Sequence, residues 1–254
     1  MILFDTPNED ILRVMLGEWE KVVHFVDKTH GKAVKHFRSL RPPYENNLFI
    51  QRYTIPASNN TYTVVSKPTI DDCVAVWFYL KTDGAYGMRK FITLKRNERG
   101  KDDLPFTPAW TLDIYTGHFL SRYRERTGAK SQTVDELFVQ FLEQNARRGL
   151  GIPAHLVNPA IDKNDDRQCA VISDEGLSFV EYEEIVLNGI KVAVNENKTF
   201  VAKDNLYYQQ AVSLHASDWF VTRTKLLKAR KDGASADRLV KILDDGIFSR
   251  PRKP

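Results

Sequence analysis

The sequence predicts an α+β fold in which antiparallel sheet packs against N-terminal, central and C-terminal helices. Stretches with apolar residues at helical spacing alternate in blocks with stretches rich in β-branched and aromatic residues. The blocks run helix, strand, helix, strand, helix, which is typical of α+β folds and unlike a doubly wound parallel sheet. The 254 residues suit one domain, or alternatively two packed subdomains at 1–128 and 129–254.

The N-terminal helical region is expected to begin after a capping box formed by Thr6 and Glu9. An apolar stripe at helical spacing then runs through residues 11–26. We expect Gly31 to break this helix, and residues 32–40 to form a shorter second helix that ends before two prolines.

The first β region is marked by four runs of β-forming residues. The last two flank a glycine-containing turn and predict a hairpin. A polar stretch at 95–108, interrupted by glycine and proline, predicts a long surface loop. The four predicted strands cover residues 48–54, 62–66, 73–81 and 88–94.

Two central helices are expected next. The first covers about 115–127 and ends at Gly128, a residue type that often ends helices. The second covers 134–148 and begins with a capping box of Thr133 and Glu136.

The second β region follows a predicted loop at 151–168 and extends from 169 to 201. Turn residues divide it at 174–176, 188–189 and 195–197, which leaves 198–201 as the last strand. The remaining helical patterns predict C-terminal helices over 205–229 and 235–248.

The charge balance is mildly basic, with 37 Lys and Arg against 33 Asp and Glu and a net charge of +4. This is compatible with RNA or another anionic partner but does not by itself indicate one. The run from Thr222 to the C-terminus holds ten basic and four acidic residues. It either contacts an anionic partner or forms a solvated tail.

Cys73 and Cys169 each lie in an apolar, strand-like run, which favours two buried free thiols over a disulfide. The N-terminus has no signal-peptide pattern, and no apolar run approaches the roughly 18 residues that a membrane span requires. We therefore expect a cytoplasmic protein with no membrane partner. The oligomeric state is left open.

The stretch 118–126 is the strongest functional signal. At about 100° per residue, one helix face carries His118, Arg122, Glu125 and Arg126. His118 suits general acid–base chemistry, and Arg122 and Arg126 suit phosphate contacts. Glu125 would orient an arginine or the imidazole. The alternative is a structural helix face, on which the arginines pair with Glu125 and nearby acids.

The pattern His118-x3-Arg122-x2-Glu125-Arg126 resembles a helix signature in phage and toxin proteins of the barnase/EndoU/colicin/RelE-like ribonuclease group. The resemblance covers about a dozen residues. It implies helices before a small antiparallel sheet, RNA cleavage without metal, His118 as acid or base, and Arg122 and Arg126 on phosphates. The strands predicted before this helix depart from that small fold.

Two further groups of residues are candidates for substrate binding. Lys198, Thr199 and Lys203 lie in the last predicted strand and just after it, and could complete a phosphate site or be solvated strand-end residues. Arg89 and Lys90 belong to the predicted hairpin, where aromatic and cationic residues interleave. That pattern fits a stacking platform for single-stranded nucleic acid or ordinary core packing.

No metal site and no cofactor are expected. His24, His30 and His36 are six residues apart and fall on different helix faces, and the acidic loop at 162–166 fits a solvated loop better than a cation site. The chain has no Cys-x-x-Cys, His-Glu-x-x-His, phosphate-binding glycine loop or nucleophile elbow.

These patterns lead to two functional hypotheses. The first is a metal-independent RNA-cleaving or toxin-like enzyme that uses the face carrying His118. The second is a non-catalytic nucleic-acid- or protein-binding module of phage or mobile-element origin.

Overall fold

A computed structural model of the chain describes residues 1–40, 48–68, 74–84, 88–96, 109–131, 133–145, 151–158, 160–165, 167–173 and 175–205. The two expected C-terminal helices, most of the expected loop at 95–108, and Cys73 lie outside these residues.

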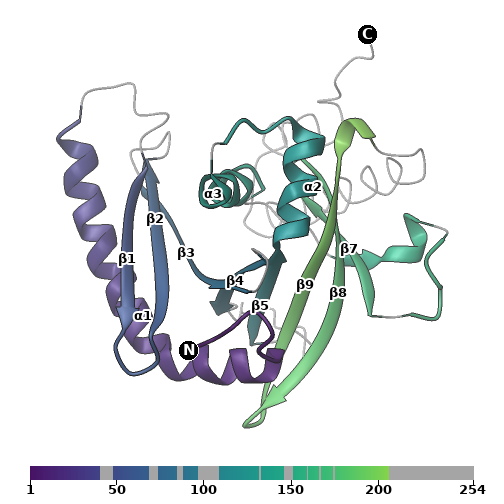
Figure 1. Cartoon of the computed structure of the whole chain (residues 1–254), viewed down its shortest axis with the longest axis horizontal. Helices are drawn as coiled ribbons and strands as arrows, with labels where there is room; N and C mark the ends of the chain where they lie inside the picture. The colour runs from purple at the N-terminus through teal and green to yellow at the C-terminus, as the bar shows by residue number, and fades with distance from the viewer. Residues whose placement is uncertain are drawn as a thin grey trace, which may run out of the picture.

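The α+β class is confirmed. Among the described residues, nine strands form one curved sheet with helices on both faces (Figure 1). All neighbouring strands are antiparallel except β5 and β9, which are parallel, so the sheet is mixed. The order is β1-β2-β3-β4-β5-β9-β8-β7-β6, with bounds β1 Phe49–Ile55, β2 Asn60–Pro68, β3 Val74–Asp83, β4 Arg89–Arg96, β5 Trp110–Thr116, β6 Gly151–Pro153, β7 Gln168–Ser173, β8 Gly176–Leu187 and β9 Ile190–Ala202.

Helix α1 (Asn8–Arg38) follows the outer side of the curved sheet (Figure 1). The expected break at Gly31 is wrong. Gly31 is exposed, a side chain placed there would have open space around it, and the helix continues beyond it to bury Ala33 and Phe37. The expected capping box is also absent, because the Thr6 hydroxyl accepts from the Leu3 amide instead and Pro7 occupies the cap position.

Helices α2 (Gly117–Thr127) and α3 (Val134–Gln144) lie on the inner side of the curve (Figure 1). The expected end at Gly128 is confirmed, with a left-handed φ of 67°. The expected capping box at Thr133 and Glu136 forms, whereas α3 ends four residues before Arg148. Aromatic rings from both helices and from the sheet fill this layer of the core: Tyr79, Phe91, Tyr115, Phe119, Tyr123, Phe138, Phe141 and Phe200.

Replacing Thr133 with alanine removes the hydroxyl that accepts from the Glu136 amide at 3.2 Å. We expect the free energy of unfolding to fall by about 1 kcal/mol, which is typical for loss of an N-cap. Urea denaturation measures this difference. Lys130→Ala, an exposed change just before α3, is the control and should leave the midpoint unchanged; equal midpoints for both variants would contradict the prediction.

The two β regions belong to one sheet, because β5 and β9 pair along Trp110–Tyr115 and Val192–Asn197. The turn expected at 195–197 is therefore wrong. The Asn195 amide donates to Asp113 at 2.9 Å, and the Asn197 amide donates to the Ile114 carbonyl at 3.1 Å. Both amides bind the neighbouring strand, so these residues stabilise pairing where their composition suggested a turn.

Lys198 is the extra residue of a β-bulge in β9. Phe179 lies opposite Thr199 and Val180 lies opposite Asn197, so Lys198 has no opposite residue in β8. The bulge occurs where the pairing of β5 with β9 ends at Asn197.

This bulge reverses which side chains of β9 face each helical layer. Val194 packs in the core beneath α1, whereas Phe200, an even number of residues later, packs with α2 and α3. Side chains alternate in a regular strand, so one extra residue is needed to place both on these opposite faces.

Candidate functional site

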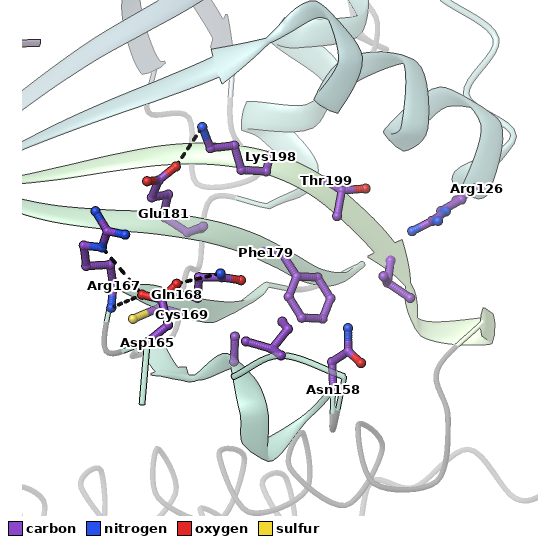
Figure 2. Close-up of a pocket in the computed structure, with 14 residues that line it drawn as sticks. Arg126, Asn158, Asp165, Arg167, Gln168, Cys169, Phe179, Glu181, Lys198 and Thr199 are labelled. Atoms are coloured by element: carbon purple, nitrogen blue, oxygen red, sulfur yellow. Dashed lines mark hydrogen bonds and ion pairs between the residues drawn. The ribbon is translucent and has the colours of Figure 1, made fainter. Parts of the chain in front are cut away.

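A cavity of about 560 Å³ lies beside the second half of β9, near the end of α2 (Figure 2). We call it the α2 pocket. Three of the residues predicted from the sequence, Arg126, Lys198 and Thr199, line it together. Residues that the sequence did not suggest complete the lining: Ala154, Asn158, Ile161, Asp165, Arg167, Gln168, Cys169, Phe179, Val180, Glu181 and Val201.

The wall formed by β8 lies on the α1 side of the sheet. Ile185 packs against the core beneath α1, and Phe179 lies six residues earlier in β8, which contains no inserted residue. The two side chains therefore share a face. Figure 2 shows the Phe179 ring inside the pocket, between Thr199 and Asn158.

The other wall comes from the segment between α3 and β7. Residues 151–168, expected to be a loop, instead contain the short strand β6 and one 3-10 turn at Ala154–Leu156. Ala154 and Val157 are buried, and this fixes the position of Asn158 at the pocket.

Arg126 reaches the pocket from the last turn of α2. Its guanidinium donates a hydrogen bond to the Phe200 carbonyl in β9, beyond the point where β5 pairs with that strand. With the described residues the guanidinium makes this one hydrogen bond, so its other N–H groups can serve an anion. The tip of the side chain points toward the pocket in Figure 2.

Lys198 is held between two carboxylates, Glu181 at 2.9 Å and Glu196 at 3.0 Å. Desolvation opposes the lysine charge, but the hydrogen bonds to these carboxylates outweigh it and raise the pKa of Lys198 above its ordinary value. The ammonium therefore stays charged, and its charge is already balanced within the protein.

The far end of the pocket carries a second charged group. Gln168 donates to Asp165 at 2.8 Å, and this hydrogen bond is the main cause that lowers the pKa of Asp165. Arg167 lies 3.6 Å from the same carboxylate. The Cys169 side chain, which forms no disulfide with a described residue, is half-buried nearby.

His118, Arg122 and Glu125 do not line the α2 pocket. Arg122 pairs with Glu125 at 2.8 Å on the surface. This pairing agrees with the alternative that the helix face is structural. His118 is exposed near the start of α2, which Thr116 caps by accepting from the Phe119 amide at 3.1 Å. His118 is eight residues from Arg126, about 12 Å along the helix.

Lys90 and Arg89, the two cations predicted from the hairpin, do not line the α2 pocket. Lys90 stacks on the Phe4 ring at 4.9 Å and shares a strand face with Ile92, which packs beneath α1. Arg89 is on the opposite face, and its backbone lies against Gly117. Tyr79 and Phe91 are almost fully buried, so these two rings support the core-packing alternative.

Lys203 follows β9 in a 3-10 turn at Lys203–Asn205.

In the described part of the chain, no three His, Cys, Asp or Glu side chains lie close enough to hold a metal ion. No described helix is both long and apolar enough to cross a lipid bilayer.

No protein family model, curated protein or solved structure matches this chain.

Proposed function

We propose that the chain binds single-stranded RNA by holding one nucleotide in the α2 pocket. The observation that carries the proposal is that Arg126 and Phe179, a cation and an aromatic ring from distant segments, line one cavity. An arginine fork suits a phosphate, and an aromatic ring suits an unstacked base.

The rest of the lining supports the same ligand. Asn158 and Gln168 carry amides, which donate and accept as base edges require. The volume of about 560 Å³ lies in the range of small-ligand pockets. Lys198 and Arg167 are close to carboxylates, which favours selective, moderate binding over the tight salt-driven binding of a strongly basic surface.

We expect Arg126→Gln to raise the dissociation constant for a short single-stranded RNA about tenfold, because one charge-assisted phosphate contact is lost. Fluorescence anisotropy with a labelled RNA measures the change. Arg122→Gln is the matched control: the same substitution on the same helix, at a residue that does not line the pocket. Equal losses for the two variants would contradict the assigned role of Arg126.

RNA cleavage by His118 is a second candidate. One observation favours it: the His118 side chain is exposed on the helix that carries Arg126. The test is an assay on mixed RNA in the presence of EDTA, with wild type and His118→Ala. Cleavage by wild type alone supports a metal-independent nuclease that uses His118; intact RNA with both proteins supports binding without catalysis.

A further inference from the structure

We infer that the outer edge of β1 binds an extended acidic peptide, which adds a further strand to the sheet. Two independent observations carry the inference: the outer edge of β1 pairs with no described strand, and a row of lysines on α1 lies beside it. The strands that line the α2 pocket, β7, β8 and β9, lie toward the other end of the sheet. The inference therefore does not depend on the RNA proposal.

The two edges of the sheet differ in how well they are protected. Among the described strands, β1 and β6 form these edges. β6 has three residues and ends in Pro153, and a short edge strand with a proline resists pairing with another chain. β1 has seven residues, contains no proline and pairs with β2 without a bulge. It is therefore long and regular enough to pair with an added strand.

Backbone groups along the outer edge of β1 are available for this pairing. In an antiparallel strand, every second residue directs its N–H and C=O groups away from its neighbour. The Gln51 side chain donates to the Ile50 carbonyl at 3.1 Å, which indicates that the even-numbered residues of β1 point outward. These residues are Ile50, Arg52 and Thr54. Outside the β1–β2 ladder, none of them makes a backbone–backbone hydrogen bond with a described residue.

The second half of α1 runs alongside β1 (Figure 1). The Phe25 ring stacks on Tyr53 with a centroid distance of 4.9 Å, and the His36 ring lies 5.3 Å from that of Phe49. Phe25 and His36 therefore mark the side of the helix that faces the edge strand.

A row of four lysines continues around α1 from that side. Val22 and Val26 pack in the core, Phe25 comes next around the helix, and the lysines follow in the same direction. At about 100° per residue they share an arc of about 60°. All four are exposed, and they lie where an added strand would pass: Lys21, Lys28, Lys32 and Lys35.

The charge of this row favours an acidic ligand. Between Lys21 and Arg38, α1 carries five basic residues and one acidic residue. None of the four lysines forms an ion pair with a described residue. Of the four, the last turn of the helix contains Lys35 alone, so the helix dipole does not account for the row. Two copies of β1 would bring two such rows together, which disfavours self-association.

The two faces of β1 define the sequence pattern of the ligand. Alternate residues of an added strand face opposite sides of the sheet. Acidic residues at every second position would face the lysines of α1. The intervening residues would lie on the other side, where Ile50 is 43% exposed and β-branched apolar side chains pack well. The geometry fits an extended segment about as long as the seven residues of β1.

The test is fluorescence anisotropy of a labelled peptide, Glu-Val-Glu-Val-Glu-Val-Glu with blocked ends, titrated with the full chain at fixed ionic strength. We expect saturable binding, and a dissociation constant about fivefold higher when Lys28 and Lys32 are both replaced by glutamine. Replacing Lys130 and Lys163, two exposed lysines outside α1, removes the same charge and should leave the affinity unchanged. Equal losses for the two double variants would contradict the assigned role of the lysine row.

A second peptide separates strand pairing from charge attraction. Proline in place of the central valine keeps the four carboxylates but removes a backbone donor and disfavours the strand. We expect this peptide not to bind. Equal affinity for the two peptides would overturn the inference.

Hydrogen exchange locates the bound peptide. We expect the amides of Ile50, Arg52 and Thr54 to exchange more slowly when the valine peptide is bound, and that of Ile152 in β6 to be unaffected. Arg52→Pro removes the central outward donor at an edge position that tolerates proline, so it should lose peptide binding and keep its circular dichroism. Unchanged exchange along β1 would overturn the inference, whether or not that variant folds.

Single-stranded RNA is the other ligand that a row of lysines could hold. Loss of RNA affinity in the Lys28 and Lys32 double variant, with unchanged peptide affinity, would assign the row to nucleic acid and overturn the inference. Arg126→Gln should leave peptide affinity unchanged, so failure of the RNA proposal and failure of this inference are distinguishable.

Discussion

Replacing Phe141 with alanine is expected to lower the free energy of unfolding by about 3 to 5 kcal/mol, the usual range for a large aromatic residue in a core. Phe141 is 1% exposed and lies at the centre of the inner aromatic cluster. Its ring centroid is 5.1 to 6.2 Å from the rings of Tyr115, Phe119, Tyr123 and Phe200.

These contacts join α3 to α2, β5 and β9. The position of Arg126 depends on the packing of α2 against β9, so loss of the Phe141 ring is expected to disturb the α2 pocket as well. Urea denaturation of Phe141→Ala measures the stability. Val186→Ala, at a residue 60% exposed near the end of β8, is the control and should change it by no more than about 0.5 kcal/mol. A loss below about 1 kcal/mol for Phe141→Ala would contradict the packing described.

Stability is also expected to fall steeply above pH 10. Burial is the main cause that raises the pKa of Tyr62, Tyr79 and Tyr123 well above the ordinary value near 10. Hydrogen bonds add to this effect: Tyr62 donates to Glu18 at 2.6 Å and Tyr123 donates to Glu175 at 2.6 Å.

The sign follows from proton binding. Below pH 10 both folded and unfolded tyrosines are protonated, and the contribution to stability is complete. Above pH 10 the unfolded chain loses these protons while the folded protein keeps them, so unfolding becomes more favourable. Each tyrosine contributes a slope of about 1.4 kcal/mol per pH unit, or about 4 kcal/mol per pH unit for the three together.

Urea denaturation between pH 8 and 11 measures this slope. Tyr123→Phe removes one titrating group, so its slope above pH 10 should be about one third smaller than that of wild type. A wild-type stability that stays constant from pH 9 to 11 would show that these hydroxyls are not held in the protonated form.

Sequence patterns were sufficient for most of the elements and insufficient where tertiary contacts override local preference. The hairpin of β3 and β4 and the capping box at Thr133 were predictable, because alternation and capping are local signals. The continuation of α1 through Gly31 was not predictable from local signals, because packing of Ala33 and Phe37 outweighs the local cost of a glycine in a helix. The turn expected at Asn195 and Asn197 is a strand, because both amides bind β5.

The candidate site, like the fold, was predictable from the sequence only in part. Charge and spacing identified Arg126, Lys198 and Thr199, which do line one pocket. Phe179 was not identified, because a single aromatic residue in a strand carries no signal for a cavity. Its exposure to the pocket depends on which face of β8 it occupies and on the strand pairing beside the bulge at Lys198. The role of His118 stays a prediction.

The proposal that RNA is held in the α2 pocket is tested most directly by photocrosslinking a single-stranded RNA to the protein and mapping the attached residues by mass spectrometry. The account predicts crosslinks at Phe179 and neighbouring lining residues such as Asn158 and Cys169, and their loss when Phe179 is replaced by leucine. Crosslinks confined to the Arg89–Lys90 hairpin or to the start of α2, with none on the pocket lining, would contradict it.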